Sequence, residues 1–69
     1  MTYAVLIEKG PTSFGATVPD LPGCVAAAES REEVERLIQE AIVEHIQGMR
    51  DDGIPVPPPV TQVATVTVS

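Results

Sequence analysis

The clearest pattern in the chain is helical and lies in its middle third. Apolar residues recur there at intervals of three and four, which draws one stripe along a helix. These residues are Val34, Leu37, Ile38, Ala41, Ile42, Ile46 and Met49. Ser30 suits the N-cap, Glu33 stands at the capping-box spacing, and Gly53 suits the first position after the helix. The pattern predicts a helix from about residue 31 to residue 52.

Short apolar and β-branched runs on either side of this helix predict strands. Tyr3–Glu8 and Phe14–Val18 are separated by turn residues, which favours an antiparallel hairpin, and Cys24–Ala28 forms a third run. After the helix, Val60–Val68 nearly alternates Thr and Val without Gly or Pro, which is typical of a fourth strand. The order β-β-β-α-β predicts an α+β fold, with one helix packed on a small, mostly antiparallel sheet.

A stiff corner joins the second and third predicted strands. Each of the two prolines in Pro19–Gly23 biases the residue before it toward extended backbone, and Pro22-Gly23 suits the centre of a type II turn. Cys24 follows the turn and starts an apolar run. We therefore interpret Cys24 as a packed apolar side chain rather than a nucleophile.

One helix covers only one face of such a sheet. Depending on register, the other face carries either Tyr3, Val5 and Ile7 or Ala4 and Leu6. Both sets are mostly apolar, and a chain of about this size buries only about 60% of its unfolded surface. These features favour a homo-oligomer, a dimer or tetramer. The alternative is a monomer in which the threonines of the last predicted strand keep the open face hydrated.

Composition narrows the classes of function. The 69 residues form a single domain, 1–69, and ten acidic against four basic side chains give a net charge of −6. Phosphate contacts require a basic footprint, so we expect no direct nucleic-acid binding, whereas an acidic surface suits a basic partner. No apolar run approaches the roughly 20 residues of a membrane span. The first residues also lack a signal-peptide pattern, so we expect no membrane association and a cytoplasmic protein.

No catalytic or metal-binding pattern can be read. One His and one Cys make no metal-ligand spacing, and there is no Ser-His-Asp or Cys-His arrangement. A two-metal nuclease needs several carboxylates around its ions. Glu8 and Asp20 are the only carboxylates on or beside predicted strands. We therefore expect no catalytic residue, no metal and no cofactor.

The acidic residues of the helix fall into two groups. Those around the first turn are favoured by the helix dipole and by capping. Glu40 and Glu44 are like charges at i,i+4, while Asp51 and Asp52 lie at the negative end of the dipole. Each of the latter costs about 0.3–1 kcal/mol at an exposed site. Because local stability does not explain these four residues, they are our candidates for contacting a cationic partner, with simple solubility as the alternative.

Several motifs, taken together, resemble a known family. The string Pro19-Asp20-Leu21-Pro22-Gly23-Cys24 precedes a small apolar run and an acid-capped helix, and Gly53-Ile54-Pro55-Val56-Pro57 follows the helix. This arrangement resembles the HicB-like antitoxin family and covers almost the whole chain. Ala28 departs from the Gly that many relatives have before the helix cap. We expect a short form of the family, without an appended C-terminal DNA-binding domain after Ser69.

The resemblance implies a partial RNase H-like fold, with the last strand beside the first. It also implies a non-catalytic protein that binds and masks a small, basic, mRNA-cleaving toxin of the HicA type. For the Pro19–Cys24 motif we favour a structural role, with a toxin contact as the alternative. A different hypothesis is a stand-alone homo-oligomeric binding or structural module that has no toxin partner.

Overall fold

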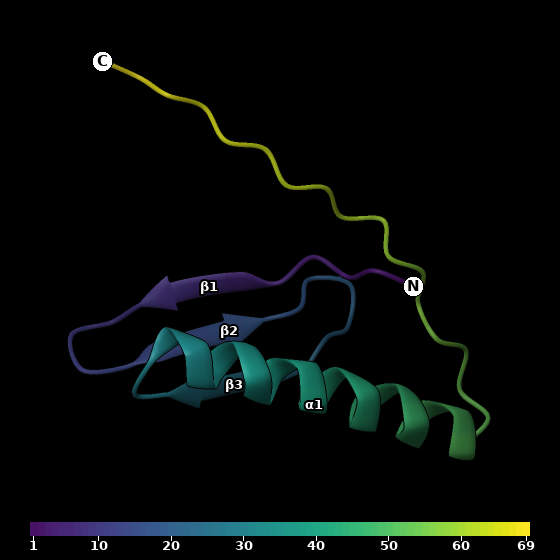
Figure 1. Cartoon of the computed structure of the whole chain (residues 1–69). Helices are drawn as coiled ribbons and strands as arrows, with labels where there is room; N and C mark the ends of the chain where they lie inside the picture. Colours follow the sequence, from purple (N-terminus) through teal and green to yellow (C-terminus); the bar gives the residue numbers. More distant parts are fainter.

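The computed structural model describes the whole chain, Met1–Ser69. Along the chain it contains β1 (Leu6–Lys9), β2 (Phe14–Thr17), β3 (Val25–Ala28) and α1 (Arg31–Asp51). The three strands form one antiparallel sheet in the order β1-β2-β3, and α1 lies along one face of it (Figure 1). The predicted α+β class and the order β-β-β-α are confirmed.

The helix begins at an N-cap residue. Ser30 has an extended backbone, and its hydroxyl accepts the N–H of Glu33 at 3.1 Å. Glu32 and Glu33 place negative charge in the first turn, where the helix dipole favours it. The helix therefore starts where its sequence signals predict.

The helix ends in a Schellman motif. Gly53 has a φ of +69°, in the left-handed region that favours glycine. Its N–H donates to the carbonyl of Arg50 at 3.1 Å, and the N–H of Ile54 donates to the carbonyl of Met49 at 2.8 Å. Asp52 is the C-cap residue, so the helix is one residue shorter than predicted.

The corner between β2 and β3 is closed by its own backbone. The N–H of Cys24 donates to the carbonyl of Leu21 at 3.0 Å across Pro22-Gly23, and Gly23 has a φ of +85°. This geometry fits the predicted type II turn. The N–H of Leu21 donates to the carbonyl of Val18 at 3.1 Å, and the N–H of Val18 donates to the carbonyl of Cys24 at 3.2 Å. The loop therefore turns its apolar side chains inward.

The core lies between the sheet, this corner and the inner side of α1. Six side chains are buried in it: Ala16, Val18, Leu21, Cys24, Val34 and Ile38. Val5 and Ile7 pack against these residues, whereas Leu6 is 45% exposed. Of the two registers left open by the sequence, the observed one therefore turns Val5 and Ile7 toward α1 and Leu6 toward the open face.

The helix is much longer than the strands beside it. Its 21 residues span about 32 Å at roughly 1.5 Å per residue, whereas a four-residue strand spans about 13 Å. The C-terminal half of α1 therefore extends beyond the sheet (Figure 1).

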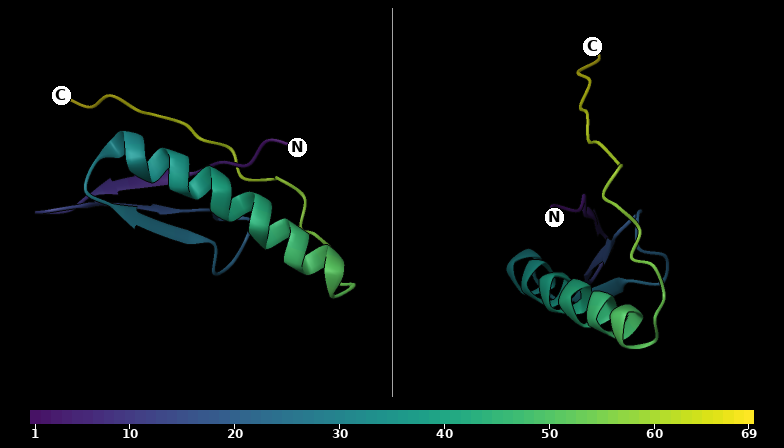
Figure 2. Two further views of the ribbon diagram at one scale, coloured as in Figure 1. Left: turned by 60° about the horizontal axis from the view of Figure 1, so that its bottom comes forward. Right: turned by 90° about the vertical axis from the view of Figure 1, so that its right-hand side faces the viewer.

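The fourth strand predicted over Val60–Val68 does not form. Residues 54–69 contain no helix or strand, and the sheet has three strands. The last part of this segment projects away from the sheet and helix (Figures 1 and 2). Alternating Thr and Val residues provide strand propensity, but a strand also needs a neighbouring edge to pair with. This chain does not bring its last residues to such an edge, so this part of the predicted β-β-β-α-β order was wrong.

Candidate partner-binding surface

Three of the four candidate acidic residues share one side of α1. With about 100° of rotation per residue, Glu40, Glu44 and Asp51 fall within about 40° of one another around the helix axis. Ile38, which is 2% exposed, lies roughly on the opposite side. All three carboxylates are exposed to solvent. The outer side of α1 therefore presents a negative stripe, and we call Glu40, Glu44 and Asp51 the acidic stripe.

A shallow depression borders the acidic stripe. It is lined by Gln39, Glu40, Val43 and Glu44. Val43 is 65% exposed, so an apolar side chain lies beside the two carboxylates of the depression. This arrangement suits a Lys or Arg side chain, whose aliphatic stem packs on an apolar residue while its charged end meets a carboxylate.

The two glutamates of the depression differ in their partners. Arg36 Nη1 donates to Glu40 Oε1 at 3.2 Å, in an exposed i,i+4 ion pair. Glu44 has no ion-pair partner within the chain. Glu32 also stands four residues from Arg36 but forms no ion pair with it, because Arg36 reaches toward Glu40 instead. Glu44 therefore carries the less compensated charge of the two.

Asp52 lies apart from the acidic stripe. It is exposed and forms the C-cap, and its N–H donates to the carbonyl of Gly48 at 3.1 Å. Asp52 follows Asp51 by about 100° of rotation, so its carboxylate does not continue the line of Glu40, Glu44 and Asp51. The structure thus brings three of the four candidates together, and a partner contact by any of them remains a prediction.

Asp20 holds the C-terminal segment against the corner. Its Oδ2 accepts the N–H of Thr61 at 2.9 Å and the N–H of Val60 at 3.1 Å, while its Oδ1 accepts the hydroxyl of Thr61 at 2.8 Å. The Tyr3 hydroxyl donates to the carbonyl of Pro57 at 2.5 Å and fixes the same segment further upstream. The sequence placed Asp20 in the corner but gave no sign of a partner about 40 residues away.

These hydrogen bonds shift the acidity of Asp20. The bond from the Thr61 N–H, followed by those from the Thr61 hydroxyl and the Val60 N–H, lowers the pKa of the Asp20 carboxyl below its ordinary value of 3.8. A carboxyl group whose pKa is lowered by hydrogen bonds stabilises the bonded arrangement. It does so to the full extent at pH values above its ordinary pKa. The contribution is lost as the pH falls through the lowered value. The bonds of Asp20 to the segment are therefore at full strength at neutral pH and are lost only in acid.

We expect the Thr61 amide proton to report this release. In an NMR titration from pH 6 to pH 2, its chemical shift should change with a midpoint below 3.8. Asp20→Asn removes the titrating group, so the same shift should then be insensitive to pH over this range. A midpoint at or above 3.8 would contradict the assignment, as would an unchanged titration in the Asn variant.

The remaining reactive side chains show no catalytic arrangement. Cys24 is 3% exposed in the core, and burial raises the pKa of its thiol, which disfavours the thiolate. His45 is half-buried on the flank of α1. Nowhere do three His, Cys, Asp or Glu side chains gather closely enough to hold a metal ion. In addition, α1 is not apolar enough to cross a membrane.

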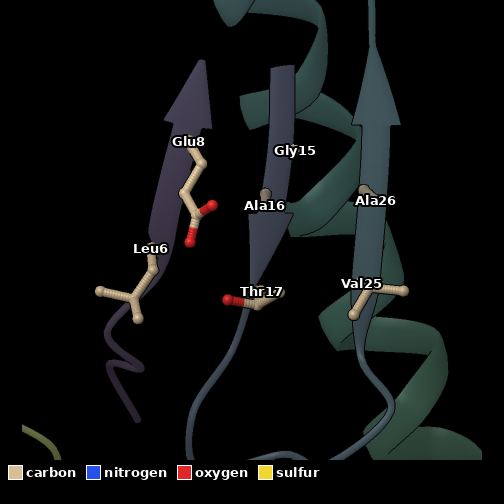
Figure 3. A pocket seen from close by; sticks show the side chains of 7 residues that line it. All are labelled: Leu6, Glu8, Gly15, Ala16, Thr17, Val25 and Ala26. Atoms are coloured by element: carbon tan, nitrogen blue, oxygen red, sulfur yellow. The ribbon is translucent and has the colours of Figure 1, made fainter. Parts of the chain in front are cut away.

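The face of the sheet away from α1 is a second exposed surface. Leu6, Thr17 and Val25 form one cross-strand row on it, and Glu8 extends over Gly15 in the next row (Figure 3). Leu6 is 45% and Val25 is 60% exposed. With no side chain at Gly15, a shallow hollow of about 180 Å³ remains between these side chains. The open face is therefore mixed in character, less apolar than β1 alone suggested.

Comparisons with known proteins agree on one family. The family model described as the HicB_like antitoxin of bacterial toxin-antitoxin systems matches residues 3–68. A chain of the solved HicA3 and HicB3 toxin-antitoxin complex has 28% sequence identity and a TM-score of 0.74, over 87% of this chain and 70% of that chain.

A phage protein is also similar. It is the uncharacterized 14.9 kDa protein in the rep-hol intergenic region of Haemophilus phage HP1 (strain HP1c1), 39% identical over 57 residues. The match covers 83% of this chain and 43% of the phage protein, so the chain spans less than half the length of this relative. Since the family match extends over nearly all of its residues, the chain belongs to the HicB-like antitoxin family of bacterial toxin-antitoxin systems.

Proposed function

We propose that this protein is the antitoxin of a small, basic, HicA-type toxin and that it acts without catalysis, by covering the surface with which the toxin binds RNA. The observation that carries the proposal is the acidic stripe on the outer side of α1. Its carboxylates are exposed and lie opposite the core, so they are free to meet another protein. Family membership and the similarity to a chain of a HicA3 and HicB3 complex support the choice of partner.

The electrostatics explain how such a surface would mask the toxin. An RNA-cleaving enzyme needs Lys and Arg side chains to hold phosphates. A row of carboxylates can bind the same side chains in place of the RNA backbone. The net charge of −6 would also speed the encounter with a basic partner. Val43 would add an apolar contact in the depression between Glu40 and Glu44.

The same residues support an antitoxin that acts without catalysis. The one thiol is buried and its pKa is raised, and the carboxylates of the acidic stripe are spread along about 16 Å of helix rather than gathered around one point. Inhibition would then depend on occupancy, with one antitoxin chain needed for each toxin surface that is covered.

Mixing the purified protein with the small basic chain encoded beside its gene tests this proposal. At about 50 mM salt we expect one co-eluting complex on a sizing column and loss of the toxin's RNA cleavage at stoichiometric antitoxin. Both effects should weaken as salt screens the charges. An unrelated basic protein of similar size should elute separately. Separate elution of the toxin itself at low salt, with RNA cleavage unaffected, would refute the proposal.

A self-assembling module without a toxin is the second candidate function. It is favoured by the exposed Leu6 and Val25 on the open face of the sheet. Such a protein would associate with itself in the absence of any toxin. Sedimentation of the protein alone, together with the toxin-binding experiment, distinguishes the two functions, and a positive result in both would mean that the antitoxin is also an oligomer.

A further inference from the structure

The C-terminal half of α1 has an apolar side in addition to the acidic stripe. A groove of about 290 Å³ runs along it, and the helix lines this groove with Ile42, Val43, Ile46, Gln47 and Arg50. Ile42 and Ile46 are half-buried, and Val43 is 65% exposed. This part of α1 extends beyond the sheet, so no strand covers it (Figure 1). The groove therefore leaves apolar surface open to a partner.

The N-terminal residues form the other wall of the groove. Met1 and Tyr3 line it, and the N-terminus lies at the same end of the molecule as the C-terminal half of α1 (Figures 1 and 2). The Tyr3 hydroxyl donates to the carbonyl of Pro57, which fixes the position of the ring. This wall is held in place before any partner binds, so binding does not have to order it.

Arg50 adds a positive charge to the groove. The two ion pairs of the chain use Arg31 and Arg36, and no carboxylate pairs with Arg50. Arg50 is exposed, and its position in the last turn is favourable for a cation. Its guanidinium keeps five N–H donors that no side chain of this protein satisfies. The groove therefore combines apolar surface with a cation that is free to bind a carboxylate.

The groove is continuous with the acidic stripe through Val43. This side chain lines both the groove and the depression at Glu40 and Glu44. Around α1 the surface thus changes from carboxylates, through an exposed valine, to apolar residues with one arginine. A partner that covers the acidic stripe also reaches the groove.

We propose, on the basis of the proposed antitoxin function, that the groove selects the cognate toxin by binding a segment with an apolar side chain beside a carboxylate. The apolar side chain packs against Tyr3 and Ile46, and the carboxylate accepts hydrogen bonds from Arg50. The acidic stripe attracts any basic protein and does not distinguish one from another. Arg50 repels a surface that is basic throughout, which makes the groove the selective part of the interface.

Charge favours the toxin over a second copy as the occupant of the groove. Each copy carries a net charge of −6, and the acidic stripe lies beside the groove. Two copies docked here would bring like charges together. A basic protein that carries one carboxylate next to an apolar residue complements both parts of the surface.

Arg50→Gln tests the selective role, because overall charge and the groove predict opposite results. The substitution makes the protein more acidic, so attraction by charge alone predicts tighter binding of a basic toxin. We expect at least about tenfold weaker binding at about 50 mM salt, since a charge-assisted hydrogen bond is lost. Titration of labelled toxin measures the dissociation constant, and circular dichroism confirms that the helix is retained.

Two controls accompany this variant. Arg36→Gln makes the same change of net charge but frees Glu40 from its ion pair, so it should bind the toxin at least as tightly as the wild type. A lysine homopolymer carries no side-chain carboxylate and no large apolar side chain. It should bind Arg50→Gln at least as tightly as it binds the wild type.

Gln47→Trp tests the apolar part of the groove without changing any charge. Gln47 is exposed and lines the groove but not the depression, so an indole at this position fills the space intended for the toxin. We expect toxin binding to weaken by at least about tenfold. Thr12→Trp is the matched control, because it adds the same ring to an exposed loop at the other end of the molecule (Figure 1).

Three outcomes would overturn the selective groove. They are toxin binding by Arg50→Gln as tight as that of the wild type, toxin binding by Gln47→Trp as tight as that of Thr12→Trp, and a change in the sedimentation of the protein alone on Gln47→Trp. The last would mean that a second copy occupies the groove. If the wild type binds the toxin, the first two refute the groove and leave the antitoxin function standing. A wild type that binds no toxin refutes both.

Discussion

Replacing Leu21 with alanine is expected to lower the free energy of unfolding by about 2–5 kcal/mol. Leu21 is 0% exposed and lies at the tip of the corner between β2 and β3, where it packs in the core together with Val34 and Ile38 of α1. At roughly 0.05–0.15 kcal/mol per residue, a chain of this length has a total stability of only about 3–10 kcal/mol. The substitution should therefore unfold a large fraction of the protein.

Urea denaturation followed by the helical circular dichroism signal measures this loss. Leu6→Ala is the matched control, because it removes the same atoms from a side chain that is 45% exposed on the open face of the sheet. It should cost less than about 1 kcal/mol, since little apolar surface leaves the core. If the two variants shift the urea midpoint equally, Leu21 does not have the central packing role that its burial indicates.

The elements set by local sequence could be predicted without the structure. Ser30 caps α1 through its own hydroxyl, and Gly53 ends it in a left-handed conformation. The corner was equally local, because two prolines and Gly23 restrict the backbone whatever lies around them. In each case the signal and the structure it specifies lie within a few residues of each other.

The segment Val60–Val68 shows where local signals stop being sufficient. Its alternating Thr and Val residues describe a segment that can be a strand, but pairing depends on an edge being within reach. The three hydrogen bonds of Asp20 are a similar case, because a carboxylate in a corner has no sequence feature that points to Val60 and Thr61. Contacts across 40 residues depend on the folded path of the chain.

The acidic stripe was predictable in part, because helical periodicity is a local signal but the pairing of charges is not. Helical periodicity alone places Glu40, Glu44 and Asp51 on one side of α1. Which cation pairs with which acid depends on side-chain rotamers, and Arg36 selects Glu40 over Glu32. Asp52 was grouped with the others by its sign of charge, but the rotation of about 100° per residue turns it away from their side of the helix.

On the proposed antitoxin function, Glu44→Lys is expected to weaken toxin binding by at least about tenfold at 50 mM salt, about 1.4 kcal/mol or more. Glu44 has no ion-pair partner in the chain, so its charge is available to a Lys or Arg of the toxin. Glu40→Lys should have a smaller effect, because Arg36 already pairs with Glu40 at 3.2 Å. Titration of labelled toxin with each variant measures the two dissociation constants.

Loss of helix cannot imitate this result, because Glu44→Lys replaces a like-charge pair by a favourable one. Lys at position 44 follows Glu40 by four residues in the better orientation, which stabilises a helix by about 0.2–0.5 kcal/mol. Glu8→Lys makes the same change of net charge on the open face of the sheet, on the side away from α1 (Figure 3). If Glu8→Lys weakened binding as strongly, the toxin would respond only to overall charge, and the outer side of α1 would not be its contact surface.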